Sequence, residues 1–315
     1  MKNDFLTMIE QADTIAITGH VRPDGDCVGS TVGLYNYIIS NYDKQVQIYL
    51  EEFSKDFLFL HDADKISHTP TDQVYDLCIA VDCGDKERQG DFLPIFERAK
   101  RTMCVDHHIS NPGFGEVCYV DEEACSAAEA LYKLMEQDKI NKNAAEALYM
   151  GIVHDTGVFK HSNTTKSAMS IAGDLIEKGA NPSFIIDETF YKKTFVANKL
   201  LGIALTKAEQ HADGRIISTV LETEDFRKSG AGKIDTDGIV DQLRITEGTE
   251  TAVFIYQTGD EEYKISLRSN NIVDVSRISC NHGGGGHVRA AGFSMKGDIK
   301  EILAGVIEEI KEQLC

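Results

Sequence analysis

Aspartate and histidine residues form short clusters along this 315-residue chain, with the composition of a site for two divalent cations. They are His20, Asp24 and Asp26 in HVRPDGD, Asp82 in VDCGD, Asp106, His107 and His108 in VDHH, and Asp155 in HDTG. Two cations about 3.5 to 4 Å apart need anionic oxygens and neutral imidazoles, with a carboxylate that bridges both ions. Carboxylates gathered without a cation would raise one another's pKa and destabilise the fold. The clusters therefore predict bound metal, unless they lie at the surface.

The ligand types narrow the choice of metal. Carboxylate combined with imidazole suits a hard to borderline ion such as Mn²⁺, and the absence of thiolate pairs argues against structural zinc. Mg²⁺ and Co²⁺ stay open, because ligand type alone does not separate them from Mn²⁺. A single aspartate after a strand is more often a helix cap or turn residue, so the metal hypothesis depends on the clusters taken together.

Short apolar runs precede the clusters and would bring them to one place. TIAIT comes before the first cluster, LCIA before VDCGD and RTM before VDHH, and each run is typical of a buried strand. Ligands of open α/β sheets bind at the carboxyl ends of the strands, so these clusters should share one edge. The run NAAEALYMGIVHD has small and apolar residues at helical spacing, which places Asp155 at the end of a helix.

The first half of the chain alternates strands and helices. TIAIT (14–18) and QVQIYL (45–50) are predicted strands with the helix VGSTVGLYNYIIS between them, and LCIAV, TMCV and VCYV continue the strands. CSAAEALYKLMEQ and the segments 164–180 and 182–190 have helical patterns. This order predicts an α/β fold, a mostly parallel sheet flanked by helices, in a domain spanning 1–190.

The pattern changes near residue 213. RIISTVL, TAVFIYQ and YKISLRS are rich in strand formers, IVDQLRI is a short helix, and DIKEILAGVIEEIKEQL is a longer helix. We expect a smaller α/β domain with a mixed sheet over 213–315, joined to the first by a helical linker over 191–212. A small substrate would lie in a cleft between the two domains.

The motifs also match a known family. The chain resembles the DHH phosphoesterases in four motifs, HVRPDGDCVGS, VDCGD, VDHH and GIVHDTGVF, and NHGGGGHVRAAG resembles the signature of the DHH-associated domain. The resemblance covers nearly the whole chain. It is strongest to the branch that shortens very small RNAs to mononucleotides and dephosphorylates 3′-phosphoadenosine 5′-phosphate (pAp). Hydrolysis of a cyclic dinucleotide such as c-di-AMP, or of linear pApA, is the enzymatic alternative, and a non-catalytic nucleotide-binding regulator is the other.

The resemblance implies roles for the clustered residues. Asp82 would bridge the ions and be essential for catalysis, His20 and Asp24 would hold one ion, and Asp26, His107 and Asp155 the other. A water shared by the ions would attack phosphorus in line. His108 is a catalytic candidate that contacts the phosphate or protonates the leaving oxygen. Asp106 would orient a ligating histidine.

Substrate contacts are expected from both domains. The first motif contributes Arg22, although an exposed loop arginine needs no functional cause. In the glycine-rich run, the missing side chains would let backbone amides approach a phosphate or sugar, with a flexible turn as the alternative. By resemblance, Arg268 would bind a terminal phosphate or the base. The full set of substrate-binding candidates is Arg22, Arg268, Ser269, Asn270, Gly284, Gly285, Gly286 and His287.

Composition and charge restrict the partners. Lys and Arg number 32 against 51 Asp and Glu, a net charge of −19, so a long nucleic acid would be repelled. Short RNA oligonucleotides and nucleoside bisphosphates are therefore the expected partners, and a homodimer stays open. No apolar run approaches the roughly 20 residues that cross a bilayer, and no secretion signal is visible. The eight cysteines form no C-x-x-C pair, which favours a reducing cytoplasm.

Overall fold

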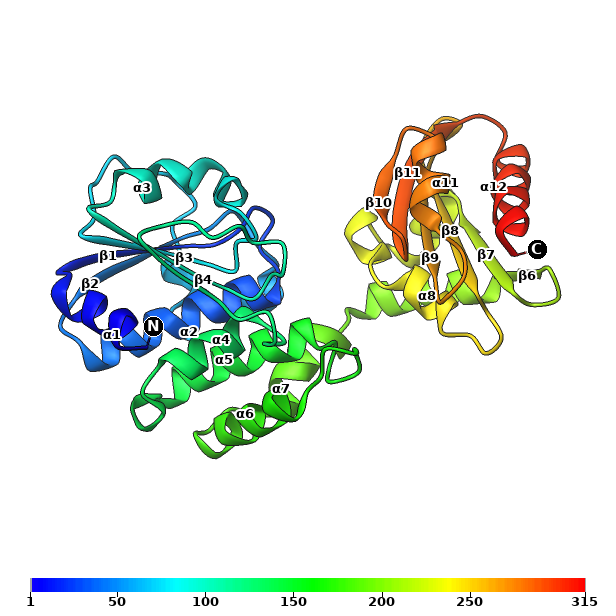
Figure 1. Ribbon diagram of the computed structural model, residues 1–315. Helices are drawn as coiled ribbons and strands as arrows, with labels where there is room; N and C mark the ends of the chain where they lie inside the picture. Colours follow the sequence, from blue (N-terminus) through cyan, green and yellow to red (C-terminus); the bar gives the residue numbers. More distant parts are fainter. Residues whose placement is uncertain (1, 315) are drawn as a thin grey trace. The chain divides into compact units, whose positions relative to one another are not determined.

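The computed structural model describes residues 2–314 and divides the chain into two compact units (Figure 1). The first unit ends at Lys192 and the second begins at Lys193. Each unit has its own sheet and its own buried apolar core, as two domains of this size should. No helix in residues 2–314 is both long and apolar enough to cross a bilayer.

The first unit contains a five-stranded sheet in the order β2-β1-β3-β4-β5, and every pairing is parallel. Its strands are β1 (Thr14–Thr18), β2 (Gln45–Tyr49), β3 (Leu77–Val81), β4 (Arg101–Asp106) and β5 (Val117–Val120). The predicted parallel sheet is confirmed. Because the strands run the same way, their carboxyl ends meet at one edge, and three of the four motifs begin there.

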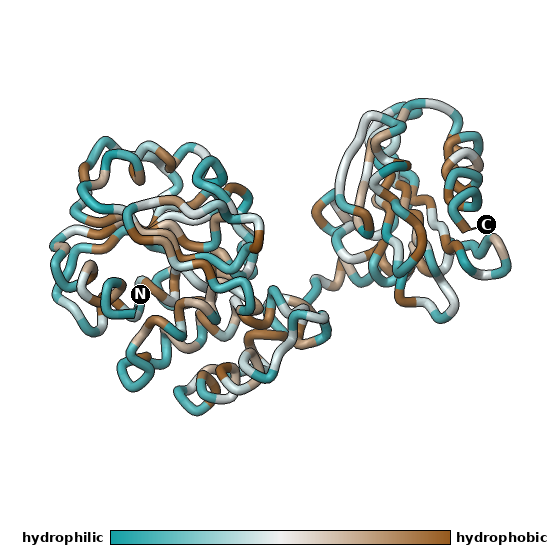
Figure 2. The backbone as a smooth tube through the Cα atoms, in the orientation of Figure 1, coloured by the Kyte–Doolittle hydropathy of each residue, from teal (hydrophilic) through white to brown (hydrophobic). Residues whose placement is uncertain are grey.

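Both faces of this sheet are covered, since alternate residues along each strand point to opposite sides. Ile15 and Ile17 of β1 join the large core against α1, α2, α4 and α5, whereas Ala16 joins a smaller core against α3. Figure 2 shows these strands as apolar in the interior of the unit. The helices are α1 (Lys2–Gln11), α2 (Gly25–Asn41), α3 (Leu93–Arg98), α4 (Ala127–Leu134), α5 (Lys142–Asp155), α6 (Lys166–Glu177) and α7 (Pro182–Ile186).

Short helical turns complete the first unit. Turns of 3-10 helix occur at Lys55–Phe57, Ala63–Lys65, Lys86–Phe92 and Gln137–Lys139, and a π-helical turn at Asp187–Tyr191. The helix α5 ends at Asp155, as its pattern predicts. The stretch Lys86–Phe92 matters most for the site, because it follows the β3 motif directly.

The second unit is built on a six-stranded mixed sheet in the order β10-β11-β9-β8-β7-β6. The β7–β8 pairing is parallel and the other four are antiparallel. The strands are β6 (Glu209–His211), β7 (Ile216–Leu221), β8 (Thr251–Gly259), β9 (Glu262–Ser269), β10 (Gly285–His287) and β11 (Ala290–Lys296). The mixed sheet predicted for this half is confirmed.

Helices cover both faces of the second sheet as well. One face packs on α11 and α12, where Ile302 and Val306 contact the core, and the other packs on α8 and α10. The helices are α8 (Phe195–Thr206), α9 (Thr223–Ser229), α10 (Ile239–Arg244), α11 (Val275–Asn281) and α12 (Ile299–Leu314), with a 3-10 turn at Lys233–Thr236.

The predicted linker helix is placed differently from the expectation. The expected linker covered 191–212, but α8 belongs to the second unit and ends at Thr206, after which Glu209–His211 forms an edge strand. Leu200 and Ala204 are fully buried against strands of that unit, so burial of its apolar face fixes this helix.

Candidate metal centre

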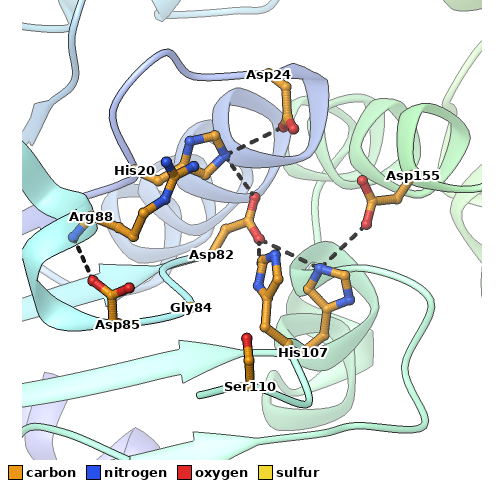
Figure 3. Close-up of a pocket in the computed structure, with 10 residues that line it drawn as sticks. His20, Asp24, Asp82, Gly84, Asp85, Arg88, His107, Ser110 and Asp155 are labelled. Carbon is orange, nitrogen blue, oxygen red and sulfur yellow. Dashed lines mark hydrogen bonds and ion pairs between the residues drawn. The ribbon is translucent and has the colours of Figure 1, made fainter. Parts of the chain in front are cut away.

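Donor groups from four elements meet at the carboxyl edge of the first sheet (Figure 3). His20 lies just beyond β1, Asp82 just beyond β3 and His107 just beyond β4, while Asp155 closes α5. They line a cavity of about 230 Å³ within the first unit, with the full lining His20, Asp24, Asp82, Gly84, Asp85, Arg88, His107, His108, Ser110 and Asp155.

Asp82 occupies the centre of this arrangement and is only 2% exposed. Its Oδ2 lies 3.5 Å from Nε2 of His20, and its Oδ1 lies 3.5 Å from Nε2 of His107. Oδ1 is buried and accepts no hydrogen bond from the rest of residues 2–314. A buried carboxylate oxygen without a partner is costly, so a cation at this position would compensate it. The backbone of Asp82 is also left-handed (φ 58°), as strained residues at functional sites often are.

His107 links Asp82 to a second group of acids. Its Nε2 lies 3.3 Å from Oδ2 of Asp155 and 3.9 Å from Oδ2 of Asp26. The ligand atoms of Asp26, His107 and Asp155 all fall within 4.8 Å of one another. A second group with the same spacing contains His20, Cys27 and Asp82. A third group, made of Asp82, Asp106, His107 and His108, shares Asp82 with the second group and His107 with the first. Donor groups connected in this way around Asp82 fit two cations.

Asp24 and Asp26 also stabilise the local fold. The Asp24 carboxylate caps α2, accepting hydrogen bonds from the backbone N–H groups of Asp26 (3.0 Å) and Cys27 (3.1 Å). Asp26 is fully buried and accepts from Ala127 N (2.6 Å) and Ala128 N (3.1 Å) at the start of α4. Each carboxylate oxygen has further lone pairs, so these bonds still allow both residues to face a cation.

Asp106 orients His108. Its Oδ1 lies 2.7 Å from Nδ1 of His108, and its Oδ2 accepts a 2.7 Å hydrogen bond from the Asn111 amide. The sequence prediction gave Asp106 the task of orienting a metal-binding histidine, yet its contact is with the catalytic candidate His108. Asn111 carried no sequence signal, because a single loop asparagine is typical of an ordinary turn.

The charges within the cluster perturb one another. Burial raises the pKa of Asp155 to about 7, helped by the nearby Asp82 charge. Burial and the same charge raise the pKa of Asp26. Burial alone would lower the pKa of His107, but its contact with Asp82 raises it to about 10. Protons and imidazoles thus offset the crowded negative charge, and a bound cation would favour the deprotonated form of each donor.

The chain after Asp155 is held in an unusual backbone conformation. Gly157, Val158 and Phe159 have φ values of 54°, 58° and 61°, and a β-branched residue rarely adopts such a value. Asn163 donates a 3.1 Å hydrogen bond to the carbonyl of Asp155, which fixes the end of α5. The strained backbone therefore lies directly after Asp155, where a metal-binding side chain must be positioned.

Arginines differ in their relation to this cavity. Arg22 is exposed and does not belong to the lining, although it lies in the first motif. Arg88 belongs to the lining, and the sequence prediction missed it because it stands in a short 3-10 stretch with no periodic pattern. Ser110 and the Cys27 thiol were also missed. Cys27 had a usable signal, since it directly follows Asp26 in the motif.

The substrate-binding candidates at the end of β9 and directly after it already make hydrogen bonds within the second unit. The buried Ser269 hydroxyl donates to Val273 O (2.6 Å), and the Asn270 amide donates to Thr249 O (2.8 Å) and accepts from Arg244 (2.8 Å). Arg268 lies 3.5 Å from Asp241. These contacts give Ser269 and Asn270 structural roles, and a contact of either residue with substrate stays a prediction.

The glycine-rich run is packed closely at two positions. A side chain on Gly284 would collide with Gly292 and Phe293, and one on Gly286 would collide with Ala290 and Ala291, so both glycines permit close approach to β11. Gly285 and His287 are exposed in β10. The structure thus explains Gly284 and Gly286 by packing and leaves Gly285 and His287 accessible.

A parallel α/β sheet with carboxylates and imidazoles at its carboxyl edge defines a class of proteins with a divalent-cation site. Residues 14–152 match the DHH family, N-terminal domain, and residues 212–312 match the DHHA1 domain. The chain thus contains the N-terminal domain of the DHH family followed by a DHHA1 domain, and the resemblance read from its motifs is confirmed.

Known relatives are similar over most of this chain. The Bacillus subtilis protein named bifunctional oligoribonuclease and PAP phosphatase NrnA is 28% identical over 94% of this chain and 93% of its own length. The Listeria monocytogenes cyclic-di-AMP phosphodiesterase PdeA is 27% identical over 92% of this chain but only 46% of its own length. An exopolyphosphatase-related protein from Bacteroides fragilis has the same fold, with a TM-score of 0.83 and 24% identity over 99% of this chain and 95% of that one.

Proposed function

We propose that this protein is a two-metal phosphoesterase that hydrolyses very short oligoribonucleotides to mononucleotides and dephosphorylates pAp to AMP. The observation that carries the proposal is Asp82, a buried carboxylate among metal-binding side chains, with one oxygen that accepts no hydrogen bond from residues 2–314. The similarity to NrnA over nearly the full length of both chains supports the choice of substrates.

The donor groups divide into two sets. In this proposal Asp82 would contribute to both sites, His20 and Asp24 would complete one set of donors, and Asp26, His107 and Asp155 would complete the other. The distances of 3.3 to 3.9 Å around His107 Nε2 support the second set, because a cation would fit among these atoms with small adjustments.

Bound divalent cations lower the pKa of water and stabilise charge that develops on phosphorus. The protein's own contribution is to fix the donors and to supply His108. Because Asp106 holds Nδ1 of His108 at 2.7 Å, Nε2 is left for the leaving oxygen or the phosphate. The imidazole is 43% exposed, so substrate can reach it.

We further propose Mn²⁺ as the ion and the cytoplasm as the compartment. Carboxylates with imidazoles suit Mn²⁺, and all described cysteines are free, as in a reducing compartment. The net charge of −19 supports short substrates over long nucleic acids, because the field of the whole protein opposes a long polyanion.

The decisive assay compares four substrates with Mn²⁺ present: a labelled RNA dinucleotide, a 24-nucleotide RNA, pAp and c-di-AMP. The proposal expects rapid hydrolysis of the dinucleotide and of pAp, with the long RNA and the cyclic dinucleotide largely spared. The Asp82→Asn variant, purified in the same way, serves as the control, because loss of hydrolysis in this variant assigns the activity to this protein and not to a contaminating enzyme.

Hydrolysis of c-di-AMP or pApA is the second candidate, favoured by the similarity to PdeA. Preference for the cyclic substrate in the same assay would select it. Binding of these nucleotides without any hydrolysis would select a regulator instead. The complete set of donor side chains counts against a regulator, since a protein that only binds nucleotides has no need for each of them.

A further inference from the structure

One basic side chain faces the acidic cavity of the first unit. Arg88 is the only arginine or lysine among its lining residues, which also include Asp24, Asp82, Asp85 and Asp155. Its side chain extends from the Lys86–Phe92 turn toward the side of the cavity that holds His20 (Figure 3). Within residues 2–314 its guanidinium forms neither a hydrogen bond nor an ion pair, even though carboxylates surround the cavity.

The backbone that carries Arg88 is fixed at several points. The carbonyl of Arg88 accepts a 2.7 Å hydrogen bond from Val21 N, and its N–H donates to Asp85 Oδ1 (2.9 Å). The next residue, Gln89, is fully buried and accepts a 2.7 Å hydrogen bond from the hydroxyl of Thr18 at the end of β1. The position of Arg88 is therefore tied directly to the motif that supplies His20.

Gly90 makes this attachment possible. Its backbone has φ 55° and ψ −129°, and a side chain at this position would collide with Val21. Only glycine adopts this conformation readily. The turn is thus shaped so that it packs against the first motif and holds Arg88 at the cavity.

We propose that Arg88 binds the phosphate group that undergoes hydrolysis. A guanidinium offers a planar fork of N–H donors that matches phosphate oxygens, and an unpaired one loses no existing ion pair on binding. The phosphate under attack is the one feature that pAp and an RNA dinucleotide must both place beside Asp82. The inference rests on the proposed function and adds the residue that holds the reacting group.

This role gives a distinctive kinetic signature. A residue that binds the base or a terminal phosphate would affect the two substrates differently, whereas Arg88→Ala should lower kcat/KM on pAp and on the dinucleotide by the same factor. Loss of one charge-assisted hydrogen-bonded pair predicts a decrease of about 10- to 100-fold. Inhibition by inorganic phosphate should weaken in parallel, and Arg88→Lys should restore part of the activity, since lysine keeps the charge but not the fork.

Controls come from the same turn. Lys86→Ala removes an equal charge, but the Lys86 ammonium lies near Glu87 (3.9 Å) and Glu97 (3.7 Å) and is absent from the cavity lining, so its kinetics should match the wild type. Mn²⁺ binding, measured by titration with detection of free Mn²⁺ by electron paramagnetic resonance, should be equal in wild type and Arg88→Ala. A change within twofold on both substrates, a loss confined to one substrate, or a loss explained by weaker Mn²⁺ binding would overturn the proposal.

A second measurement separates this inference from the proposed function. If the wild type hydrolyses neither substrate, the proposed function fails, but phosphate binding can still be followed by ³¹P line broadening on the Mn²⁺-loaded protein. Broadening in the wild type that is strongly reduced in Arg88→Ala and retained in Lys86→Ala supports the phosphate site. Equal broadening in all three proteins, or none in the wild type, overturns it.

Discussion

The two units of this protein differ in whether their motif side chains already have bonding partners within the fold. In the first unit the motif side chains converge on one cavity, and a central oxygen of Asp82 has no hydrogen-bond partner within the described chain. In the second unit most motif side chains are already bonded internally, such as Ser269 to Val273 and His282 to Glu309. Unsatisfied buried groups point to a missing ligand, whereas satisfied ones are explained by the fold alone.

The largest expected effect tests the unpartnered oxygen. Replacing Asp82 with asparagine removes the shared negative charge, so hydrolysis of pAp and of the dinucleotide should fall by at least about 10³-fold. Urea unfolding curves should show that the Asp82→Asn variant keeps its fold. Asp91→Asn is the control, because Asp91 is exposed in the same region and lies outside the cavity lining. Substantial residual activity in Asp82→Asn would remove the two-metal assignment.

A smaller effect is expected at Asp106. Its carboxylate holds His108 without belonging to the two donor sets proposed above, so Asp106→Ala should lower kcat by about 10- to 100-fold and leave Mn²⁺ affinity nearly unchanged. The measurement is kcat alongside a Mn²⁺ titration. A large loss of Mn²⁺ affinity with normal kcat at saturating metal would instead make Asp106 a ligand.

Two histidines that flank the glycine run offer a matched pair in the second unit. His282 stacks on Phe293 and its Nε2 lies 2.5 Å from Glu309 Oε1, whereas His287 is exposed. His282→Ala should lower the free energy of unfolding of this unit by about 1 to 2 kcal/mol. His287→Ala should leave stability unchanged and raise KM by about 2- to 10-fold. Hydrogen exchange of β11 and α12, compared with KM for pAp, tests the pair, and the reverse pattern would exchange the two roles.

The smallest effect concerns an ion pair in the second unit that belongs to none of the proposed sites. Burial alone would raise the pKa of Asp225, but contacts with Lys207 (2.6 Å) and with Glu222 N (2.8 Å) hold this pKa below its usual value. A lowered carboxyl pKa stabilises the fold above the unfolded-state pKa near about 4, and this stabilisation is lost as pH falls through the folded-state pKa.

Asp225→Asn should therefore cost about 1 kcal/mol at pH 7, and its difference from the wild type should shrink below about pH 4. Urea unfolding at pH 7 and pH 3 measures both values. A difference that is the same at the two pH values would mean that the charge of Asp225 contributes nothing.

The sequence predicted the parallel sheet and the meeting of the motifs because both depend on periodicity and on a general rule about strand ends. The place of Arg88 in the cavity could not be predicted from the sequence, because the direction of that side chain depends on the left-handed Gly90 and on the hydrogen bond between Gln89 and Thr18. For Ser269, the family resemblance implied a substrate contact, but the Val273 carbonyl that accepts the hydrogen bond of its hydroxyl is visible only in three dimensions.

The contact of Asp26 with the start of α4 affects how related sequences should be interpreted. Its two carboxylate oxygens hold the first N–H groups of α4, so a descendant protein that no longer catalysed anything would still need this aspartate in order to fold. Selection for stability alone would then preserve it. By contrast, Oδ1 of Asp82 accepts no hydrogen bond from the described chain that would stabilise the fold. Loss of Asp82 would therefore be tolerated once catalysis was no longer required. The presence of Asp82, rather than that of Asp26, is the informative mark of a working enzyme.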